Sequence, residues 1–153
     1  MSAASLRIAG ASDVPALFDI RLGVTENAMT RDELAQAGVT PQSVEAALKA
    51  NARAWLAEIG GEAAAFVMAD NDEGCVFAMF VTPGFEGRGF GRMLMGEAER
   101  YLSRDHATLW LNTGADARIR AHGFYRRLGW RMAGPAGKGE LRYEKTVTME
   151  KDR

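Results

Sequence analysis

A glycine-rich segment constrains this chain more than any other feature of its sequence. Residues 81–94 read VTPGFEGRGFGRML and connect an apolar run of strand type directly to an amphipathic helical pattern. Three glycines alternate with other residues, at positions 87, 89 and 91. Glycines permit positive φ angles and let backbone N–H groups approach a ligand closely, and the N-terminus of the next helix adds partial positive charge. The segment therefore favours a local anion site, to which Arg88 and Arg92 bring formal charge.

Two common phosphate-binding loops do not fit this spacing. A Walker loop counted from Gly84 has Phe90 and Gly91 where it requires Lys and then Ser or Thr. The dinucleotide fingerprint G-x-G-x-x-G fails because its third glycine would fall on Arg92 or Leu94. The spacing leaves a pyrophosphate that is bound without a metal or a nicotinamide.

The rest of the chain predicts one α+β domain in which helices pack on a mixed sheet. A length of 153 residues suits a single domain, so residues 1–153 are treated as one unit. Hydrophobic periodicity predicts the element order β-α-α-β-β-β-α-β-α-β-β, with residues 24–39 left outside regular structure because their periodicity is weak. The predicted strands are 6–9, 55–59, 63–69, 75–81, 107–111, 130–132 and 141–149, and the predicted helices start near residues 12, 40, 90 and 117.

Composition excludes several classes of protein. The net charge of -1 provides no general field for nucleic acid. Cys75 is the only cysteine, which excludes an internal disulfide, and its apolar strand predicts a buried thiol. His106 and His122 lack metal-ligand spacing and are expected at the surface or at caps, so no metal is predicted. The N-terminus has no signal-peptide pattern and no apolar run could span a bilayer, which favours a cytoplasmic protein without a membrane partner.

A second motif follows the glycine-rich segment. The helical stretch ARIRAHGFYRRLGW carries Ala121, Phe124, Tyr125, Gly129 and Trp130 in the pattern A-x-x-F-Y-x-x-x-G-F/W. Together the two segments resemble the GCN5-related N-acetyltransferase (GNAT) family. The coenzyme A loop of that family follows V-x-P and reads Q/R-x-x-G-x-G/A before a helix. Residues 81–83 and 89–91 of this chain match that loop.

The match has two departures. Glu86 stands where the family has Gln or Arg, and Arg118 stands where it has Asn seven residues before the tyrosine. The resemblance therefore implies phosphate contacts from the backbone of residues 87–92 but gives no side-chain contact at position 86. It likewise gives no contact between residue 118 and the pantetheine arm of coenzyme A.

The resemblance implies a GNAT-like acyl-CoA N-acyltransferase fold and an acetyl-CoA-dependent enzyme. Such an enzyme moves acetyl to a primary amine of a small molecule or peptide by direct attack in a ternary complex, with no metal. In the family, the strand before the loop diverges from the next parallel strand, and pantetheine enters the gap. The coenzyme-binding residues implied are Met79, Phe80, Val81, Gly87, Arg88, Gly89, Phe90, Gly91 and Arg92.

Tyr125 is the candidate general acid, because a phenol of pKa about 10 can protonate the departing thiolate. Its helical spacing is equally typical of a core residue. The amine must lose a proton before it attacks, and the candidate carboxylates for this role are Glu26 and Glu73. Either carboxylate is also explained as an ordinary solvated side chain.

Two other functions stay open on the sequence alone. The departures at Glu86 and Arg118 are compatible with a coenzyme A-binding sensor or assembly subunit that has no transferase activity. A purely structural α/β domain is the other alternative. The resemblance further implies a homodimer, for which an exposed final strand offers a pairing edge.

Overall fold

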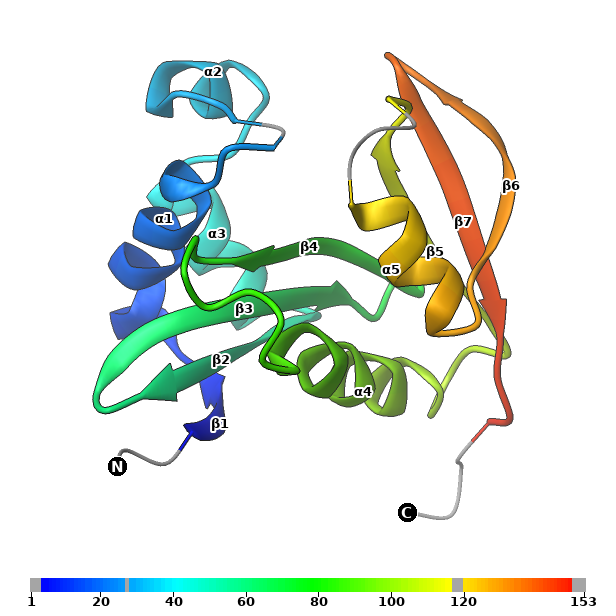
Figure 1. Cartoon of the computed structure of the whole chain (residues 1–153), viewed down its shortest axis with the longest axis horizontal. Helices are drawn as coiled ribbons and strands as arrows, with labels where there is room; N and C mark the ends of the chain where they lie inside the picture. Colours follow the sequence, from blue (N-terminus) through cyan, green and yellow to red (C-terminus); the bar gives the residue numbers. More distant parts are fainter. Residues whose placement is uncertain (1–3, 27, 117–119, 150–153) are drawn as a thin grey trace.

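The chain folds around one mixed β-sheet. The computed structural model describes residues 4–26, 28–116 and 120–149, and its seven-stranded sheet has the order β1-β2-β3-β4-β5-β7-β6 (Figure 1). Strands β1 to β4 form an antiparallel meander, β5 runs parallel to β4, β7 pairs antiparallel with β5, and β6 pairs antiparallel with β7. The strands are β1 (Ala4–Ala9), β2 (Ala52–Ile59), β3 (Glu62–Asp70), β4 (Cys75–Val81), β5 (Thr108–Gly114), β6 (Arg131–Gly137) and β7 (Glu140–Thr146).

Helices cover the two faces of the sheet. The first face carries α1 (Val14–Gly23) and α3 (Pro41–Lys49), which follow the 3-10 turn η1 (Ala11–Asp13) and flank α2 (Arg31–Gln36). The opposite face carries α4 (Phe90–Leu102), with α5 (Ala121–Arg127) beside β5 (Figure 1). Apolar side chains fill the space between the helices and each face of the sheet. Helix α4 contributes Leu94 and Met95, and helix α1 contributes Leu17 and Ile20. This burial is the main source of stability for the fold.

The sheet separates between β4 and β5. Their ladder contains one residue pair, Cys75 with Trp110, and the Trp110 N–H donates to the Gly74 carbonyl at 3.1 Å. Beyond this point the two strands diverge, and the two halves of the molecule spread apart in Figure 1. An uninterrupted sheet would have closed this gap. The gap between β4 and β5 therefore gives a ligand a route from one face of the sheet to the other.

A β-bulge at Phe77 sets the directions of the β4 side chains. Met68 on β3 pairs with Ala78 while the next residue pairs with Val76, so Phe77 has no partner. The extra residue changes which face each later side chain occupies. Val76 therefore lies in the α4-side core, whereas Ala78 and Phe80 lie in the α1-side core. Phe77 itself is 48% exposed.

The predicted α+β class and the predicted order of the main elements are confirmed, with one helix missed. Helix α2 lies in the segment that was assigned no regular structure. Its start is fixed by a capping box in which the Glu33 N–H donates to Thr30 Oγ1 at 3.1 Å and the Thr30 N–H donates to Glu33 Oε1 at 2.9 Å. The spacing T-x-x-E was therefore the available signal, although the weak periodicity concealed it.

Some predicted boundaries were wrong near the C-terminus. Strand β5 continues through Asn112 and Thr113. Strand β6 includes Pro135, because β6 is an edge strand and an edge strand tolerates a missing N–H donor. The last strand ends at Thr146 and not at residue 149. The predicted helix start at residue 117 lies outside the described residues, as does Arg118. Within the ranges given above, no helix has the length and hydropathy needed to cross a membrane.

Candidate active site

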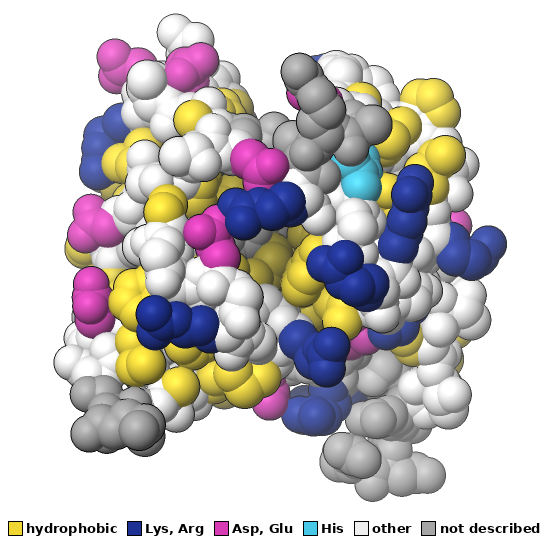
Figure 2. All heavy atoms as spheres, viewed as in Figure 1, with side chains coloured by type: hydrophobic (Ala, Val, Ile, Leu, Met, Phe, Trp, Pro, Cys, Tyr) yellow, Lys and Arg dark blue, Asp and Glu magenta, His cyan; other side chains and the backbone are white. Residues whose placement is uncertain are grey.

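A large cavity passes through the gap between β4 and β5. Its volume is about 1410 Å³. Its lining comes from α1 and the loop after it, α2, α3, β3, β4, the loop after β4, the start of α4, β5, α5 and the β6–β7 turn. Figure 2 shows the corresponding hollow, floored by hydrophobic atoms, with acidic and basic side chains meeting across it. The cavity exceeds the range of about 300–1,000 Å³ typical of small-ligand pockets. It therefore has room for a long ligand and a second molecule.

The loop after β4 is open toward this cavity. Gly87 and Gly89 have φ angles of 74° and 85°, which residues with a side chain rarely adopt. A Cβ atom added at either glycine would meet no other atom within 4 Å. Glycine is required here by the backbone conformation, and the space above the backbone is free for a ligand.

The backbone N–H groups of this loop have no hydrogen-bond partners among the described residues. In the described parts of the chain, no hydrogen bond is donated by the N–H groups of residues 86–92, and the first recorded donor is Met93, which bonds the Gly89 carbonyl at 3.1 Å. Gly89 is the N-cap of α4 and offers no side chain to cap the helix. Unpaired N–H groups at a helix N-terminus are an anion-binding arrangement. The loop therefore has the geometry of an anion site, and the pyrophosphate itself stays a prediction.

Gly91 allows α4 to approach α5 closely. A Cβ at this position would lie 2.9 Å from Cζ of Phe124 and 3.4 Å from Cε of Met79. Both of these side chains line the cavity, so Gly91 controls its width where the loop meets the gap. The third glycine of the motif thus acts through packing and not through a positive φ.

Tyr125 lies at the α5 wall of the cavity. Its side chain is 8% exposed, and its ring centre lies 5.2 Å from that of Phe124, 6.1 Å from Tyr143 and 6.3 Å from Trp130. Burial raises the pKa of Tyr125, because a phenolate is poorly solvated there. Its hydroxyl makes no hydrogen bond to any described residue. Tyr125 therefore keeps its proton at neutral pH and has a free donor.

Glu26 and Glu86 both form ion pairs with Arg120 at the mouth of the cavity. The backbone N–H of Arg120 donates to Glu26 Oε1 at 3.1 Å, and its side-chain Nε donates to Glu26 Oε2 at 3.3 Å. The Nη2 of Arg120 pairs with the Glu86 carboxylate. We call this group the Arg120 clasp. It joins the loop after α1, the glycine loop and the start of α5, and it explains the presence of an acid at position 86.

The other predicted residues occupy different places. Met79, Phe80, Val81 and Arg92 line the cavity, whereas Arg88 lies outside the lining with its guanidinium 5.2 Å from the Phe85 ring centre. Glu73 does not line the cavity either. It lies in the turn before β4, where its carbonyl accepts a hydrogen bond from Trp110 Nε1 at 2.8 Å.

Cys75 and His122 are both buried in the fold. Cys75 is buried, and burial together with nearby Asp70 and Glu73 raises the pKa of its thiol to about 12. His122 was expected at the surface or at a cap, but it is buried, where its ring bonds the Tyr143 hydroxyl at 2.8 Å and the Asp116 carbonyl at 3.0 Å. Across the described residues, no group of three His, Cys, Asp or Glu side chains is placed to hold a metal ion.

Sequence reasoning missed the residues of the α1 side of the cavity. Arg21 and Phe77 line it there, and Lys138 and Glu140 line it from the β6–β7 turn. Their positions in the sequence share no motif, since they converge only when the sheet has formed. A capping pattern or a glycine spacing could not have indicated them.

Comparisons with known proteins agree on one family. The sequence profile of the Acetyltransferase (GNAT) family matches residues 22–130. The PaiA N-acetyltransferase of Thermoplasma acidophilum, solved in complex with coenzyme A, is structurally similar with a TM-score of 0.79 at 11% identity, over 95% of this chain and 99% of that chain. The ribosomal-protein-S18-alanine N-acetyltransferase of Escherichia coli gives 0.75 at 20% identity, over 99% and 98%. A GNAT-family acetyltransferase of Staphylococcus aureus gives 0.77 at 18%, over 95% and 100%. No curated protein matches significantly in sequence.

Proposed function

Because this chain belongs to the GNAT acetyltransferase family, we propose that it transfers the acetyl group of acetyl-CoA to a primary amine by direct attack in a ternary complex. The acceptor amine belongs to a small molecule or a peptide. One observation carries the proposal: the row of unpaired N–H groups at residues 86–92 opens into a cavity that continues through the β4–β5 gap to Tyr125. An anion held at the loop would direct the rest of its molecule toward that tyrosine.

The coenzyme is held mainly by backbone. The N–H groups of residues 87–92 bind its pyrophosphate, and the partial positive charge at the start of α4 strengthens those bonds. Arg92, exposed at the cavity wall, adds a formal charge. The backbone of residues 79–81 borders the gap and supplies hydrogen bonds to the pantetheine arm. Acetyl-CoA contributes an acetyl thioester, whose oxygen gains negative charge during transfer and is stabilised by an N–H of the same strand.

Tyr125 gives a proton to the leaving thiolate. Its raised pKa keeps the phenol protonated across the neutral range, so the proton is available when the carbon–sulfur bond breaks. The same burial disfavours a free thiolate beside Tyr125, which favours proton transfer as the thiolate departs. The aromatic neighbours of Tyr125 fix the orientation of its ring.

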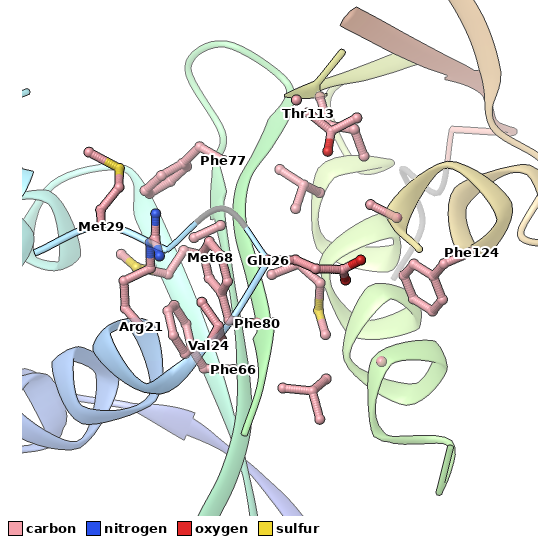
Figure 3. A pocket seen from close by; sticks show the side chains of 18 of the residues that line it. Arg21, Val24, Glu26, Met29, Phe66, Met68, Phe77, Phe80, Thr113 and Phe124 are labelled. Atoms are coloured by element: carbon pink, nitrogen blue, oxygen red, sulfur yellow. The ribbon is translucent and has the colours of Figure 1, made fainter. Parts of the chain in front are cut away.

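Glu26 accepts the proton of the acceptor amine. An alkylammonium of pKa about 10.4 must lose a proton before its nitrogen can attack. Glu26 lines the cavity, and in Figure 3 its carboxylate points toward Phe124 on α5. Its hydrogen bonds to Arg120 occupy one edge of the carboxylate, so proton transfer runs through a water on the free edge. Glu73 is not included because it lies outside the cavity lining.

Direct transfer is preferred to a cysteine-linked intermediate. A nucleophilic cysteine is active as a thiolate, and a pKa of about 12 leaves Cys75 protonated at neutral pH. Cys75 also lies at the start of β4, away from the glycine loop that follows the end of that strand. The acetyl group therefore passes from sulfur to nitrogen in one transfer, with both substrates bound.

An acceptor screen tests the proposal. Release of free thiol from acetyl-CoA is followed with amino acids, polyamines, aminoglycosides, arylamines and peptides, and acetylated products are identified by mass spectrometry. We expect amine-dependent thiol release for at least one class. Acetyl-CoA binding without turnover of any amine would instead favour a coenzyme A sensor. Cys75→Ala serves as a control and should retain the full rate.

A further inference from the structure

Arg21 is a half-buried cation that the proposed chemistry does not use. It lies in the last turn of α1 and is half-buried at the cavity wall. Its guanidinium carbon lies 4.4 Å from the ring centre of Phe80, and its Nη1 atom is buried without a hydrogen-bond partner. Burial lowers the pKa of Arg21, yet an arginine in a protein does not lose its proton near neutral pH.

No acid neutralises this charge within the described residues. Arg21 forms no ion pair or hydrogen bond with any of them. The nearby cavity acids Glu26 and Glu86 are paired with Arg120, and Figure 3 shows the Glu26 carboxylate directed away from Arg21. Burying an unpaired charge is unfavourable, and an anionic ligand that reaches Arg21 would remove that cost.

The surroundings of Arg21 are apolar. Figure 3 shows its guanidinium among Val24, Met29, Met68 and Phe77, which come from the loop after α1 and from β3 and β4. Four other cations line the cavity, and none belongs to α1: Arg92 is on α4, Arg127 is on α5, Lys138 is in the β6–β7 turn, and Arg120 is paired with Glu26 and Glu86. The α1 side therefore offers one positive charge surrounded by hydrophobic surface.

We propose that Arg21 binds a carboxylate of the acceptor, so that the acceptor is an amine carrying one carboxylate and an apolar group. Naming this ligand as the acceptor rests on the proposed function. A guanidinium donates two parallel hydrogen bonds to a carboxylate, and its single charge matches that anion. A phosphate dianion would require a second cation, which the α1 helix does not provide. The aromatic and methionine side chains would contact the apolar part of the acceptor.

A binding experiment tests this site without requiring turnover. Calorimetry compares 3-phenylpropionate with its neutral amide, 3-phenylpropionamide, which has nearly the same shape. We expect the wild-type protein to bind the carboxylate about tenfold or more tightly, as for a charge-assisted bidentate pair. Arg21→Met should abolish this preference. Arg53→Met is the matched control, because Arg53 stacks on Tyr101 at 4.5 Å but lies outside the cavity, and it should retain the preference.

Kinetics with paired acceptors separate this proposal from the proposed function. Phenylalanine is compared with phenethylamine, and 4-(aminomethyl)benzoate with benzylamine, so that two amine-to-carboxylate spacings are sampled. A carboxylate preference in kcat/KM that Arg21→Met removes, and Arg21→Lys retains in part, supports the site. Turnover without such a preference, or equal wild-type binding of the two phenylpropionyl probes, overturns it while leaving acetyl transfer intact. Arg21-dependent carboxylate binding without any turnover upholds the site and rejects only the proposed function.

Discussion

The glycine loop and the α1 side of the cavity present different kinds of groups to a ligand. At the loop, residues 86–92 present unpaired N–H groups, and the side chains at 87 and 89 are absent. On the α1 side, the cavity is lined by side chains such as Arg21 and Phe80, which come from α1 and β4. A ligand shared by a whole family can be bound by backbone, whereas a ligand particular to one member needs particular side chains.

This difference explains why the sequence indicated the glycine loop but not the α1 side of the cavity. A positive φ demands glycine, so a backbone site leaves glycines at fixed spacing in the sequence. A side-chain site leaves an arginine and a few apolar residues, which are indistinguishable from an ordinary amphipathic helix. The substitutions below test whether the loop is a backbone site.

The largest expected effect is at Gly89. Gly89→Val should abolish measurable acetyl-CoA binding, because a β-branched residue resists a φ of 85° and its side chain would occupy the space over the N–H groups. The measurement is calorimetric titration, with circular dichroism as a test of folding. Gly61→Val provides the control, since Gly61 has a φ of 79° in the β2–β3 turn outside the cavity. If the folded Gly89→Val protein keeps its affinity, the loop is not the phosphate site.

Tyr125→Phe should lower kcat by roughly a hundredfold or more, the usual contribution of a general acid. The KM for acetyl-CoA should change little, because the hydroxyl acts only as the thiolate leaves. Steady-state kinetics with an acceptor found in the screen measure both constants. Tyr101→Phe is the matched control, as its hydroxyl bonds the Asn51 carbonyl at 3.2 Å away from the cavity. An unchanged kcat in Tyr125→Phe would remove this residue from the chemistry.

Gly91→Ala should raise the KM for acetyl-CoA by about tenfold. The new methyl group would lie 2.9 Å from Phe124 Cζ, so this cavity-lining ring must move away from α4. Adding Phe124→Leu should restore part of the affinity if this contact is the cause. Gly96→Ala in the same helix meets no atom within 4 Å and should leave the KM unchanged. A KM in Gly91→Ala equal to that of the wild type would show that Phe124 can move without affecting coenzyme binding.

The smallest expected effect is at Glu86, where the Arg120 clasp joins the two regions. Glu86→Gln should lower the KM for acetyl-CoA by about threefold at low salt, because it removes a negative charge beside the phosphate site. Exposed charges interact weakly and are screened by salt, so the difference should vanish at high ionic strength. Glu62→Gln, at an exposed residue outside the cavity, is the control. A higher KM would mean that the clasp itself supports coenzyme binding.

Much of the fold could be predicted from the sequence because its signals were local. Alternating and helical periodicities identified the meander and helix α4, and two motifs identified the loop and α5. Helix α2 was missed because capping alone defines its start. The bulge at Phe77 leaves no mark in a continuous apolar strand. The Arg120 clasp and the position of Arg21 depend on contacts between distant segments, which periodicity cannot report.

We propose that the loop of residues 86–92 binds the pyrophosphate of acetyl-CoA and so directs the acetyl group toward Tyr125. Calorimetric titration of the wild-type protein with acetyl-CoA measures this binding. We expect saturable one-to-one binding in the micromolar range that weakens as salt increases, because the phosphates are the main anchor of the coenzyme. An absence of binding at millimolar acetyl-CoA would contradict it.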